Sequence, residues 1–418
     1  MVIFEPFNNP LEILPLPLKL FAKLGVTQYS VDRVRLLIFN SYLLLTFFIP
    51  KFCLGYDTIP QFFRGVAEGM CGVNTCITLF CLSFKMDQME MLLRDLKLWT
   101  DIVSITDEYK QILITLNTGI HKYTKYYFIF TNCILVAMMA SSTAGVLYIY
   151  TSQTPGQTVS FPLIMEHRLY TLNAHHDLLH WFLYHMLLIP AILIMVIIYT
   201  AKAGMFFGSI CFCSTLFSIL ALKIDRLRFL ITTEQYTAEL KEIIVLHQLA
   251  IRCAKLLQKI LMDVMLAQFT GCVLIWCFFF YSIMISGITV EGVTVAAILL
   301  SFSMETFIFC LLGNELTIKV GLNFNKMMVD CSANSNILLP KQGEQISAAV
   351  YATDWYEQPI KIQKLIIPII QQAQQRIGIT AARFYYIDVK RYGKVCTIQM
   401  LFKQQSSLTI ICLFTNRT

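Results

Sequence analysis

Charged side chains are scarce in this chain of 418 residues. Asp, Glu, Lys and Arg make up 14% of it, while 56% of its residues are hydrophobic, and the mean hydropathy is +0.63. A soluble domain carries about 25% charged residues. The low charge content therefore excludes a soluble globular protein and indicates a chain that crosses a membrane several times.

Sequence motifs that mark enzymes are also missing. The chain has no phosphate-binding Gly loop, no His-Glu-x-x-His helix, no Gly-x-Ser-x-Gly turn and no Cys-x-x-Cys pair, so we expect no enzymatic activity, no cofactor and no metal site.

Most of the 14 cysteines lie in apolar stretches, which favours packing over disulfides. Met1 to Ala22 lacks the basic start of a cleaved signal peptide, so we expect the first span to direct insertion.

Apolar runs of about 20 residues, each long enough to cross the hydrocarbon core as a helix, are what the chain does contain. We predict an all-α membrane protein with seven transmembrane helices. They are placed at Leu36–Leu54, Gly65–Phe84, Tyr126–Tyr150, Tyr199–Leu222, Val264–Thr289, Val293–Ile318 and Val395–Phe414.

Basic residues fall unevenly on the two sides of these spans. The segment before the first span and the second, fourth and sixth loops hold 27 Lys and Arg residues, whereas the other side holds four. Cationic loops stay in the cytoplasm. The N-terminus is therefore predicted to be cytoplasmic and the C-terminus extracellular.

The apolar stretch from Leu178 to Leu222 could by its length form two spans. An eighth span would move the seven basic residues of the fourth loop outside the cell, against the charge rule. We therefore predict one long kinked helix whose first part lies in the outer loop or interface.

Amphipathic patterns continue the spans on the cytoplasmic side. Apolar residues recur at helical spacing in Lys85–Lys125 and in Lys223–Asp263, and Ile360–Gly378 has a broad apolar surface. We expect cytoplasmic helical extensions that form an anchor domain. The predicted division is a cytoplasmic segment 1–35, helices one to six with the ligand pocket in 36–320, the cytoplasmic loop and anchor helix in 321–394, and the seventh helix with the C-terminus in 395–418.

Charged residues inside spans need partners, because each costs on the order of 2.5–3.5 kcal/mol at a helix centre. Glu305 and Lys403 lie deepest, and we predict that they form a buried ion pair. Glu68 and Glu315 lie near span ends, where we expect contact with interfacial water. The histidine cluster that begins at His175 is expected to form a solvated polar mouth rather than a metal site.

Met, aromatic and small residues enrich the outer halves of the middle spans. Such walls suit a small, mostly apolar ligand held by dispersion, although similar stripes also form plain helix packing. The candidate ligand-binding residues are Met138, Met139, Ser142, Gly145, Tyr148, Met205, Phe206 and Phe302.

The seventh predicted span changes from polar to aliphatic along its length. The polar run Lys403 to Ser407 is followed by Leu408 to Ile411, a pattern typical of a pore-lining helix with a hydrophobic constriction. Hydrogen bonding between helices is the alternative interpretation.

Residues of the C-terminal third carry a family resemblance. They are Cys310, Gly313, Tyr351, Trp355, Tyr356, Pro359, Thr380, Ala381, Arg383, Phe384, Ser406, Ser407, Leu408 and Thr409. Together with the inverted seven-span plan, they make the chain resemble the insect odorant receptor family. The resemblance implies a receptor subunit of the plasma membrane in sensory dendrites, which binds a small volatile odorant and assembles with the odorant receptor co-receptor into a heterotetrameric, non-selective cation channel.

The resemblance also implies positions for function. The anchor between subunits would lie in Ile360–Gly378, the odorant pocket among spans two, three, four and six, and the pore and its gate at Gln405, Thr409 and Ile410. A gustatory receptor subunit is the nearest alternative. A G-protein-coupled receptor is the rival of a different class, because Asp225-Arg226-Leu227 is similar to its Asp-Arg-Tyr triplet, but that triplet would end the fourth span here instead of the third.

Overall fold

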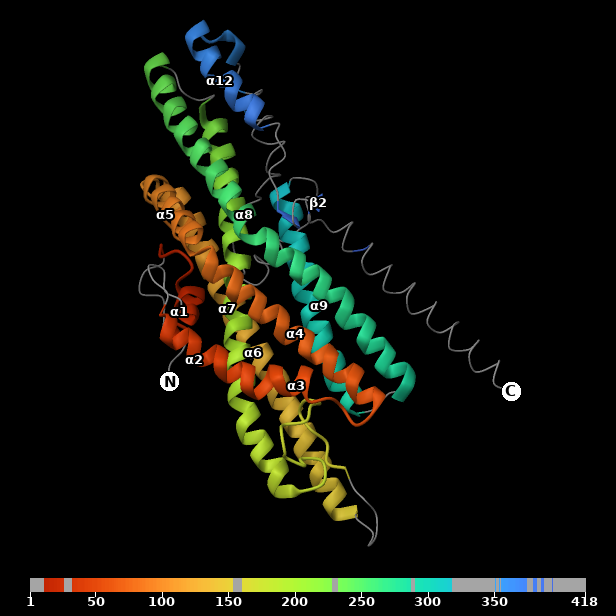
Figure 1. The fold of residues 1–418 in the computed structure, drawn as a ribbon. Coiled ribbons are helices and arrows are strands. Elements are labelled where there is room, and N and C mark those ends of the chain that lie inside the picture. The colour runs from red at the N-terminus through yellow and green to blue at the C-terminus, as the bar shows by residue number, and fades with distance from the viewer. Residues whose placement is uncertain are drawn as a thin grey trace, which may run out of the picture.

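The structure is a computed structural model that describes residues 11–25, 32–152, 160–227, 232–286, 290–317 and 355–373, with short pieces at 350, 353, 379–381, 385–386 and 393. Its described part is almost entirely helical, as predicted (Figure 1). The elements are α1 (Pro15–Lys23), α2 (Arg33–Leu43), the π-helical η1 (Leu44–Phe48), α3 (Ile49–Cys53), α4 (Ile59–Phe84), α5 (Met86–Val103), α6 (Asp107–Ser152), α7 (Leu178–Arg226), α8 (Thr233–Ser286), α9 (Val290–Thr317), the 3-10 helix η3 (Trp355–Glu357), α12 (Ile360–Ala373) and the strands β1 (Thr380–Ala381) and β2 (Tyr385–Tyr386), which pair antiparallel.

Five helical segments of the described chain are long and apolar enough to cross a membrane. They are Val34–Cys53, Ile59–Phe84, Asp107–Ser152, Leu178–Arg226 and Thr233–Ile285, and a shorter apolar stretch, Ile298–Gly313, lies within α9. These segments contain the first five predicted spans, apart from residues at their ends, and α9 covers most of the sixth. The seventh, Val395–Phe414, lies outside the described residues.

The long helix predicted between Leu178 and Leu222 is confirmed, since α7 is one continuous helix that includes Pro190. Asp177 starts it by accepting a hydrogen bond from the Leu179 amide at 2.8 Å, which satisfies an N–H that the first turn leaves open. At about 1.5 Å per residue, the 49 residues of α7 extend over about 74 Å. That length is more than twice the hydrocarbon core of about 30 Å, so α7 must project beyond it.

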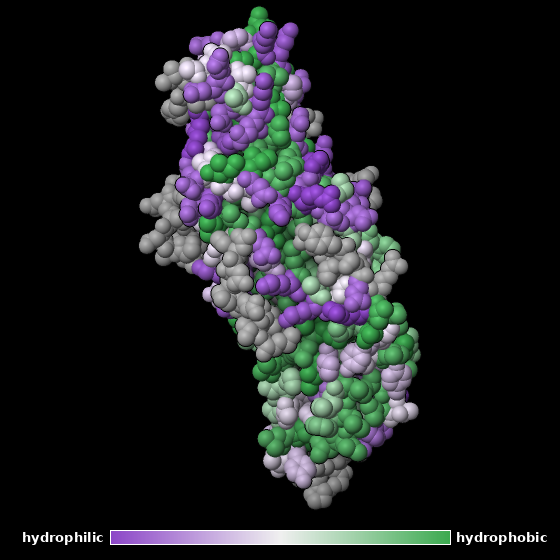
Figure 2. Space-filling model, turned by 90° about the vertical axis from the view of Figure 1, so that its left-hand side faces the viewer, coloured by the Kyte–Doolittle hydropathy of each residue, from purple (hydrophilic) through white to green (hydrophobic). Residues whose placement is uncertain are grey.

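The two ends of the bundle differ in composition. We call the end that carries α5 and α12 the anchor end, and the end that carries residues 160–177, between α6 and α7, the loop end (Figure 1). On the face shown in Figure 2, hydrophilic residues gather toward the anchor end, and hydrophobic residues cover the loop end. The extension helices predicted from Lys85–Lys125 and Lys223–Asp263 are present as α5 with the start of α6, and as the first half of α8.

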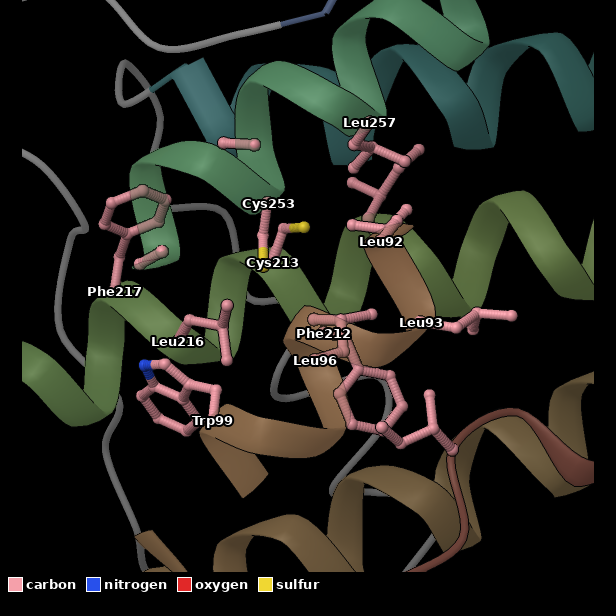
Figure 3. Close-up of a cluster of buried hydrophobic side chains, with 14 of the residues drawn as sticks. Leu92, Leu93, Leu96, Trp99, Phe212, Cys213, Leu216, Phe217, Cys253 and Leu257 are labelled. Atoms are coloured by element: carbon pink, nitrogen blue, oxygen red, sulfur yellow. The ribbon is translucent and has the colours of Figure 1, made fainter. Parts of the chain in front are cut away.

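A buried apolar core holds the anchor end together. Leu92, Leu96 and Trp99 of α5 lie against Phe212 of α7 and Leu257 of α8 (Figure 3), and each is less than 2% exposed. Burying a side chain of this size is worth roughly 1.5–3 kcal/mol. The core fixes α7 and α8 against each other, and both helices continue toward the loop end.

Candidate ligand-binding site

A cavity of about 120 Å³ lies among α4, α6, α7 and α9. For scale, an engineered apolar cavity of about 150 Å³ in another protein holds benzene. Its lining residues are Phe47, Glu68, Cys71, Gly72, Thr75, Thr131, Ile134, Leu135, Met138, Met165, Ile192, Met195, Val196, Tyr199, Ile298, Ser301 and Phe302. Most of them are aliphatic, aromatic or sulfur-containing, which suits a small apolar molecule.

Two hydroxyl groups of the lining already donate to their own helices. The Thr75 hydroxyl donates to the Cys71 carbonyl at 2.9 Å, and the Thr131 hydroxyl donates to the Tyr127 carbonyl at 3.0 Å. Each keeps its lone pairs as acceptors. The cavity can therefore offer acceptors from these two sites, but no free donor from either.

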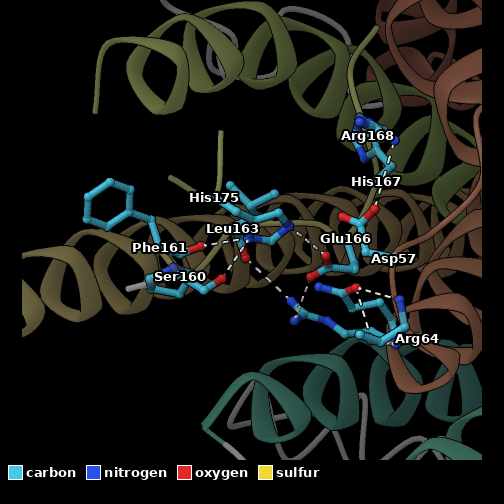
Figure 4. Close-up of polar contacts among 12 residues, drawn as sticks. Asp57, Arg64, Ser160, Phe161, Leu163, Glu166, His167, Arg168 and His175 are labelled. Carbon is cyan, nitrogen blue, oxygen red and sulfur yellow. Dashed lines mark hydrogen bonds and ion pairs between the residues drawn. The ribbon is translucent and has the colours of Figure 1, made fainter. Parts of the chain in front are cut away.

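Charged residues lie beside the cavity toward the loop end, and one of them, Glu68, belongs to its lining. We name the group formed by Lys51, Arg64, Glu68, Glu166 and His175 the loop cluster (Figure 4 shows Arg64, Glu166 and His175). Lys51 Nζ lies 2.8 Å from Glu68 Oε2, and Arg64 Nε lies 3.0 Å from Glu68 Oε1. The backbone N–H of Glu166 donates to Glu68 Oε2 at 2.9 Å. The segment between α6 and α7 is thus fastened directly to a residue of the cavity wall.

His175 completes the loop cluster from the same segment (Figure 4). Its Nε2 lies 3.0 Å from Glu166 Oε1 and its Nδ1 lies 3.1 Å from the Phe161 carbonyl oxygen. Both oxygens are acceptors, so the protonated ring, which donates from both nitrogens, fits this position best. The hydrogen bond to Glu166 accordingly raises the pKa of His175 above its ordinary value, against the opposing effect of burial.

A second polar group crosses the middle of the bundle. We name Asn74, Lys202, Gln268, Glu305 and Thr306 the midspan network. Lys202 Nζ donates to Glu305 Oε2 at 3.0 Å and to Gln268 Oε1 at 3.1 Å. Gln268 Nε2 donates to Glu305 and to the Thr306 hydroxyl at 3.2 and 3.0 Å, while Asn74 Nδ2 donates to Gln268 Oε1 at 2.8 Å. The network joins α4, α7, α8 and α9.

Each group places a buried ammonium over aromatic rings of the cavity wall. Lys202 Nζ lies 4.2 Å from the ring centre of Tyr199 and 5.9 Å from that of Phe302. Lys51 Nζ lies 5.0 Å from the ring centre of Phe47. These distances are within the range of cation–π attraction. Both Lys–Glu pairs therefore lie beside aromatic rings of the cavity wall.

The structure brings two of the eight predicted ligand residues, Met138 and Phe302, to the cavity. Ser142 lies deeper in the loop end, where its hydroxyl donates to the Pro162 carbonyl at 2.7 Å, and Gly145 packs against the same proline. The other four do not line the cavity: Met139 is partly buried beside it, Tyr148 is 71% exposed, and Met205 and Phe206 belong to the core toward the anchor end.

The expected surroundings of the charged residues need correction. Glu68 does not meet interfacial water, because its side chain is fully buried and bound by Lys51 and Arg64. Glu305 is paired with Lys202, whereas Lys403, its predicted partner, lies outside the described residues. So do the predicted pore and gate residues Gln405, Thr409 and Ile410, and the side chain of Glu315.

The histidine cluster is open at one end and buried at the other, because His176 and Asp177 are exposed and His180 is partly exposed. His185 is 6% exposed, and its Nε2 lies 3.2 Å from the Ser142 hydroxyl. Burial lowers the pKa of His167, its neighbour across Tyr184, well below the ordinary value. Among the residues that the structure describes, no group of three possible metal ligands occurs.

Sequence reasoning missed Glu166 and Phe47. Glu166 lies in a loop, where a single charge gives no burial signal, and Phe47 is one apolar residue in an apolar run. Lys202 is a charged residue within the fourth predicted span, which by itself indicates that it needs a partner. Its partner could not be chosen, since several carboxylates lie at comparable depth.

Comparison with known proteins supplies the family. The family model described as 7tm Odorant receptor matches residues 59–320. Two solved structures of the insect olfactory receptor OR5 from Machilis hrabei, one of them in complex with eugenol, share the fold with TM-scores of 0.66 and 0.65. Each is 14% identical, and each match covers 89% of this chain and 89% of that chain. No curated protein matches the sequence.

Proposed function

The chain belongs to the 7tm odorant receptor family, and from this premise we propose that it is a subunit that binds a small volatile organic ligand inside its helix bundle. With an odorant receptor co-receptor it forms a heterotetramer and opens a non-selective cation channel. The observation that carries the proposal is the apolar cavity among α4, α6, α7 and α9. A related fold has been solved with eugenol bound to the insect receptor OR5.

The loop end is the extracellular end in this proposal. The basic residues that follow α4 and α7 lie toward the anchor end, where cationic loops remain in the cytoplasm. Odorant would then reach the cavity from the side on which the loop cluster lies. Antibody access to a tag placed after Thr418 in unpermeabilised cells tests the orientation, and staining only after permeabilisation would reverse it.

Channel opening is assigned to the seventh span, with Gln405, Thr409 and Ile410 at the pore or gate. Currents are recorded from cells that express the chain with and without a co-receptor, across a panel of small esters, phenols and heterocycles. They test whether the two subunits together form a channel that a ligand opens. We expect currents across the plasma membrane, as in a sensory neuron, only in cells that express both subunits. Equal currents from the co-receptor alone would contradict a role in ligand recognition.

Filling the cavity tests where the ligand binds. Val196→Trp adds an indole to the lining on α7, and the added volume is comparable with the cavity of about 120 Å³. We expect at least a tenfold loss of apparent affinity, or no response. The matched control is Val136→Trp, because Val136 is 64% exposed on α6. Similar losses in both variants would remove the cavity from the proposal.

A further inference from the structure

The cations of both polar groups contact the cavity rings from outside the cavity. Tyr199, Phe302 and Phe47 line it, whereas Lys202 and Lys51 do not. The ammonium groups lie outside the lining, at 4.2, 5.9 and 5.0 Å from the three ring centres. The two polar groups thus share the same arrangement beside one small cavity.

Both ammonium groups are fixed in place by anions. Lys202 is held by Glu305 at 3.0 Å and Lys51 by Glu68 at 2.8 Å, and all four side chains are fully buried. A charge fixed in a medium without water acts on its neighbours with little screening. Each pair is neutral overall, and its ammonium is the group that lies within 4.2 to 5.9 Å of the ring centres.

A cation beside an aromatic ring draws the electrons of the ring toward itself. The ring face turned to the cavity then presents less negative charge than that of an isolated ring. Aromatic pairs are governed by their quadrupoles, whose negative faces repel one another. A wall with depleted faces should favour a ligand ring that is rich in electrons and disfavour one from which fluorine has withdrawn them.

A ligand amine is not the expected occupant, although Glu68 belongs to the lining. Its Oε1 accepts from Arg64, and its Oε2 accepts from Lys51 and from the Glu166 amide. A carboxylate bound in this way offers little to a further cation. Recognition is left to the apolar surface, the rings and the hydroxyl groups of the lining.

We infer that the cavity selects small neutral ligands with an electron-rich aromatic ring, and that Lys202 determines this preference through Tyr199 and Phe302. The inference rests on the proposed function, whose ligand class it narrows. Lys202 acts as a positioning and polarising residue, since it touches the rings and not the ligand. Lys51 does the same through Phe47.

Three probes of similar outline test the inference: anisole, pentafluoroanisole and cyclohexyl methyl ether. Pentafluorination reverses the ring quadrupole, and the cyclohexyl ether has no π face. For each probe we would measure the concentration that gives the same fixed rise in the unfolding temperature of the full-length receptor. Wild type should need about fivefold less anisole than pentafluoroanisole, with the cyclohexyl ether in between.

The main variant is Lys202→Met combined with Glu305→Gln, which removes both charges and keeps an oxygen that can accept from Gln268. The anisole preference should fall below about twofold. The matched control is Lys223→Met with Glu242→Gln, a Lys–Glu pair that joins α7 to α8, whereas Lys202 and Glu305 join α7 to α9, and that lies away from the cavity. Its preference should equal that of wild type. If the main variant is too unstable to measure, Lys51→Met with Glu68→Gln removes the charge behind Phe47 and should halve the preference.

The outcomes separate the two proposals. Equal binding of anisole and pentafluoroanisole by wild type, or an unchanged preference in the main variant, would overturn the inference and leave ligand binding intact. If none of the three probes stabilises wild type, the cavity does not take a small ring, and the inference fails together with the proposed site.

Discussion

The loop cluster and the midspan network use the same chemistry in different surroundings. Each contains a fully buried Lys–Glu pair beside the cavity, but the number of partners differs. Glu68 binds two cations and a backbone amide. Glu305 binds one cation and the Gln268 amide, and among the described residues its Oε1 has no hydrogen-bond partner. One anion is redundantly held, and the other depends on Lys202.

The elements that carry the two groups differ as well. The midspan network connects four long helices, so its geometry is set by helix packing. The loop cluster includes Glu166 and His175 from an irregular segment, and loops open more readily than packed helices. The midspan network should therefore govern stability and fit, and the loop cluster should govern access to the cavity.

The largest effect is expected from Lys202→Met. It leaves Glu305 buried without a cation, which costs about 3–5 kcal/mol. Lys51→Met should cost less, about 1–3 kcal/mol, because Arg64 still binds Glu68. Thermal unfolding of the solubilised receptor and its surface expression would compare the two variants.

The control for this comparison is the double variant Lys202→Met with Glu305→Gln. A neutral pair requires no compensation, so most of the lost stability should return. If Lys51→Met proves as damaging as Lys202→Met, Arg64 does not support Glu68, and the difference in redundancy between the two groups is not real.

An intermediate effect is expected from Glu166→Gln. The variant weakens the ties of the loop to Arg64 and His175, while the Glu166 backbone still reaches Glu68. Ligand should leave about five to ten times faster, since charge-assisted hydrogen bonds are worth about 1.5–3 kcal/mol and part of them remains. The decay of current after odorant washout measures this rate.

The matched change at the other group is Thr306→Val, which removes a hydrogen-bond acceptor of Gln268 and leaves the loop untouched. We expect it to alter apparent affinity more than the washout rate. Faster washout in Thr306→Val than in Glu166→Gln would contradict the division between access and fit.

Much of the fold could be predicted from composition because membrane spans leave a strong signal. An apolar run of about 20 residues has few alternatives to a helix, and basic loops resolved the stretch around Pro190 into one helix. Helix ends were less certain: α4 begins at Ile59, before the predicted span at Gly65, and α8 begins at Thr233, within the extension predicted from Lys223 to Asp263. A helix can continue through polar residues beyond the membrane. The change in hydropathy then marks the edge of the membrane and not the end of the helix.

The candidate site could be predicted only in part. Helix periodicity places Met138 and Phe302 on inward faces, but it does not say which inward face meets a cavity and which meets another helix, as Met205 and Phe206 do. Pairing is harder still. The charge of Glu305 demanded a partner, and only the three-dimensional packing of α7 against α9 selects Lys202.

The smallest effect is expected from pH. The pKa of His175 is raised above its ordinary value of about 6.5, chiefly by its hydrogen bond to Glu166. A raised pKa means that the protonated ring stabilises the folded loop. This stability is fully present below about pH 6.5 and is lost as the pH rises through the raised value. Asp57 contributes to the same shift, and Ser160 and the Phe161 carbonyl face the other ring nitrogen.

Wild type should therefore unfold at a temperature about 1–2 °C higher at pH 6 than at pH 8, because a partly exposed ion pair is worth below about 1 kcal/mol. His175→Gln can still donate to Glu166 but does not titrate, so it should lose this difference while unfolding near the wild-type temperature at pH 8. His167 should not contribute, since burial keeps its pKa well below this window. An equal pH dependence in His175→Gln would assign the titration to another group. Because the midspan network contains no histidine, a pH effect that survived loosening of the loop by Glu166→Gln would also break the contrast between the two groups.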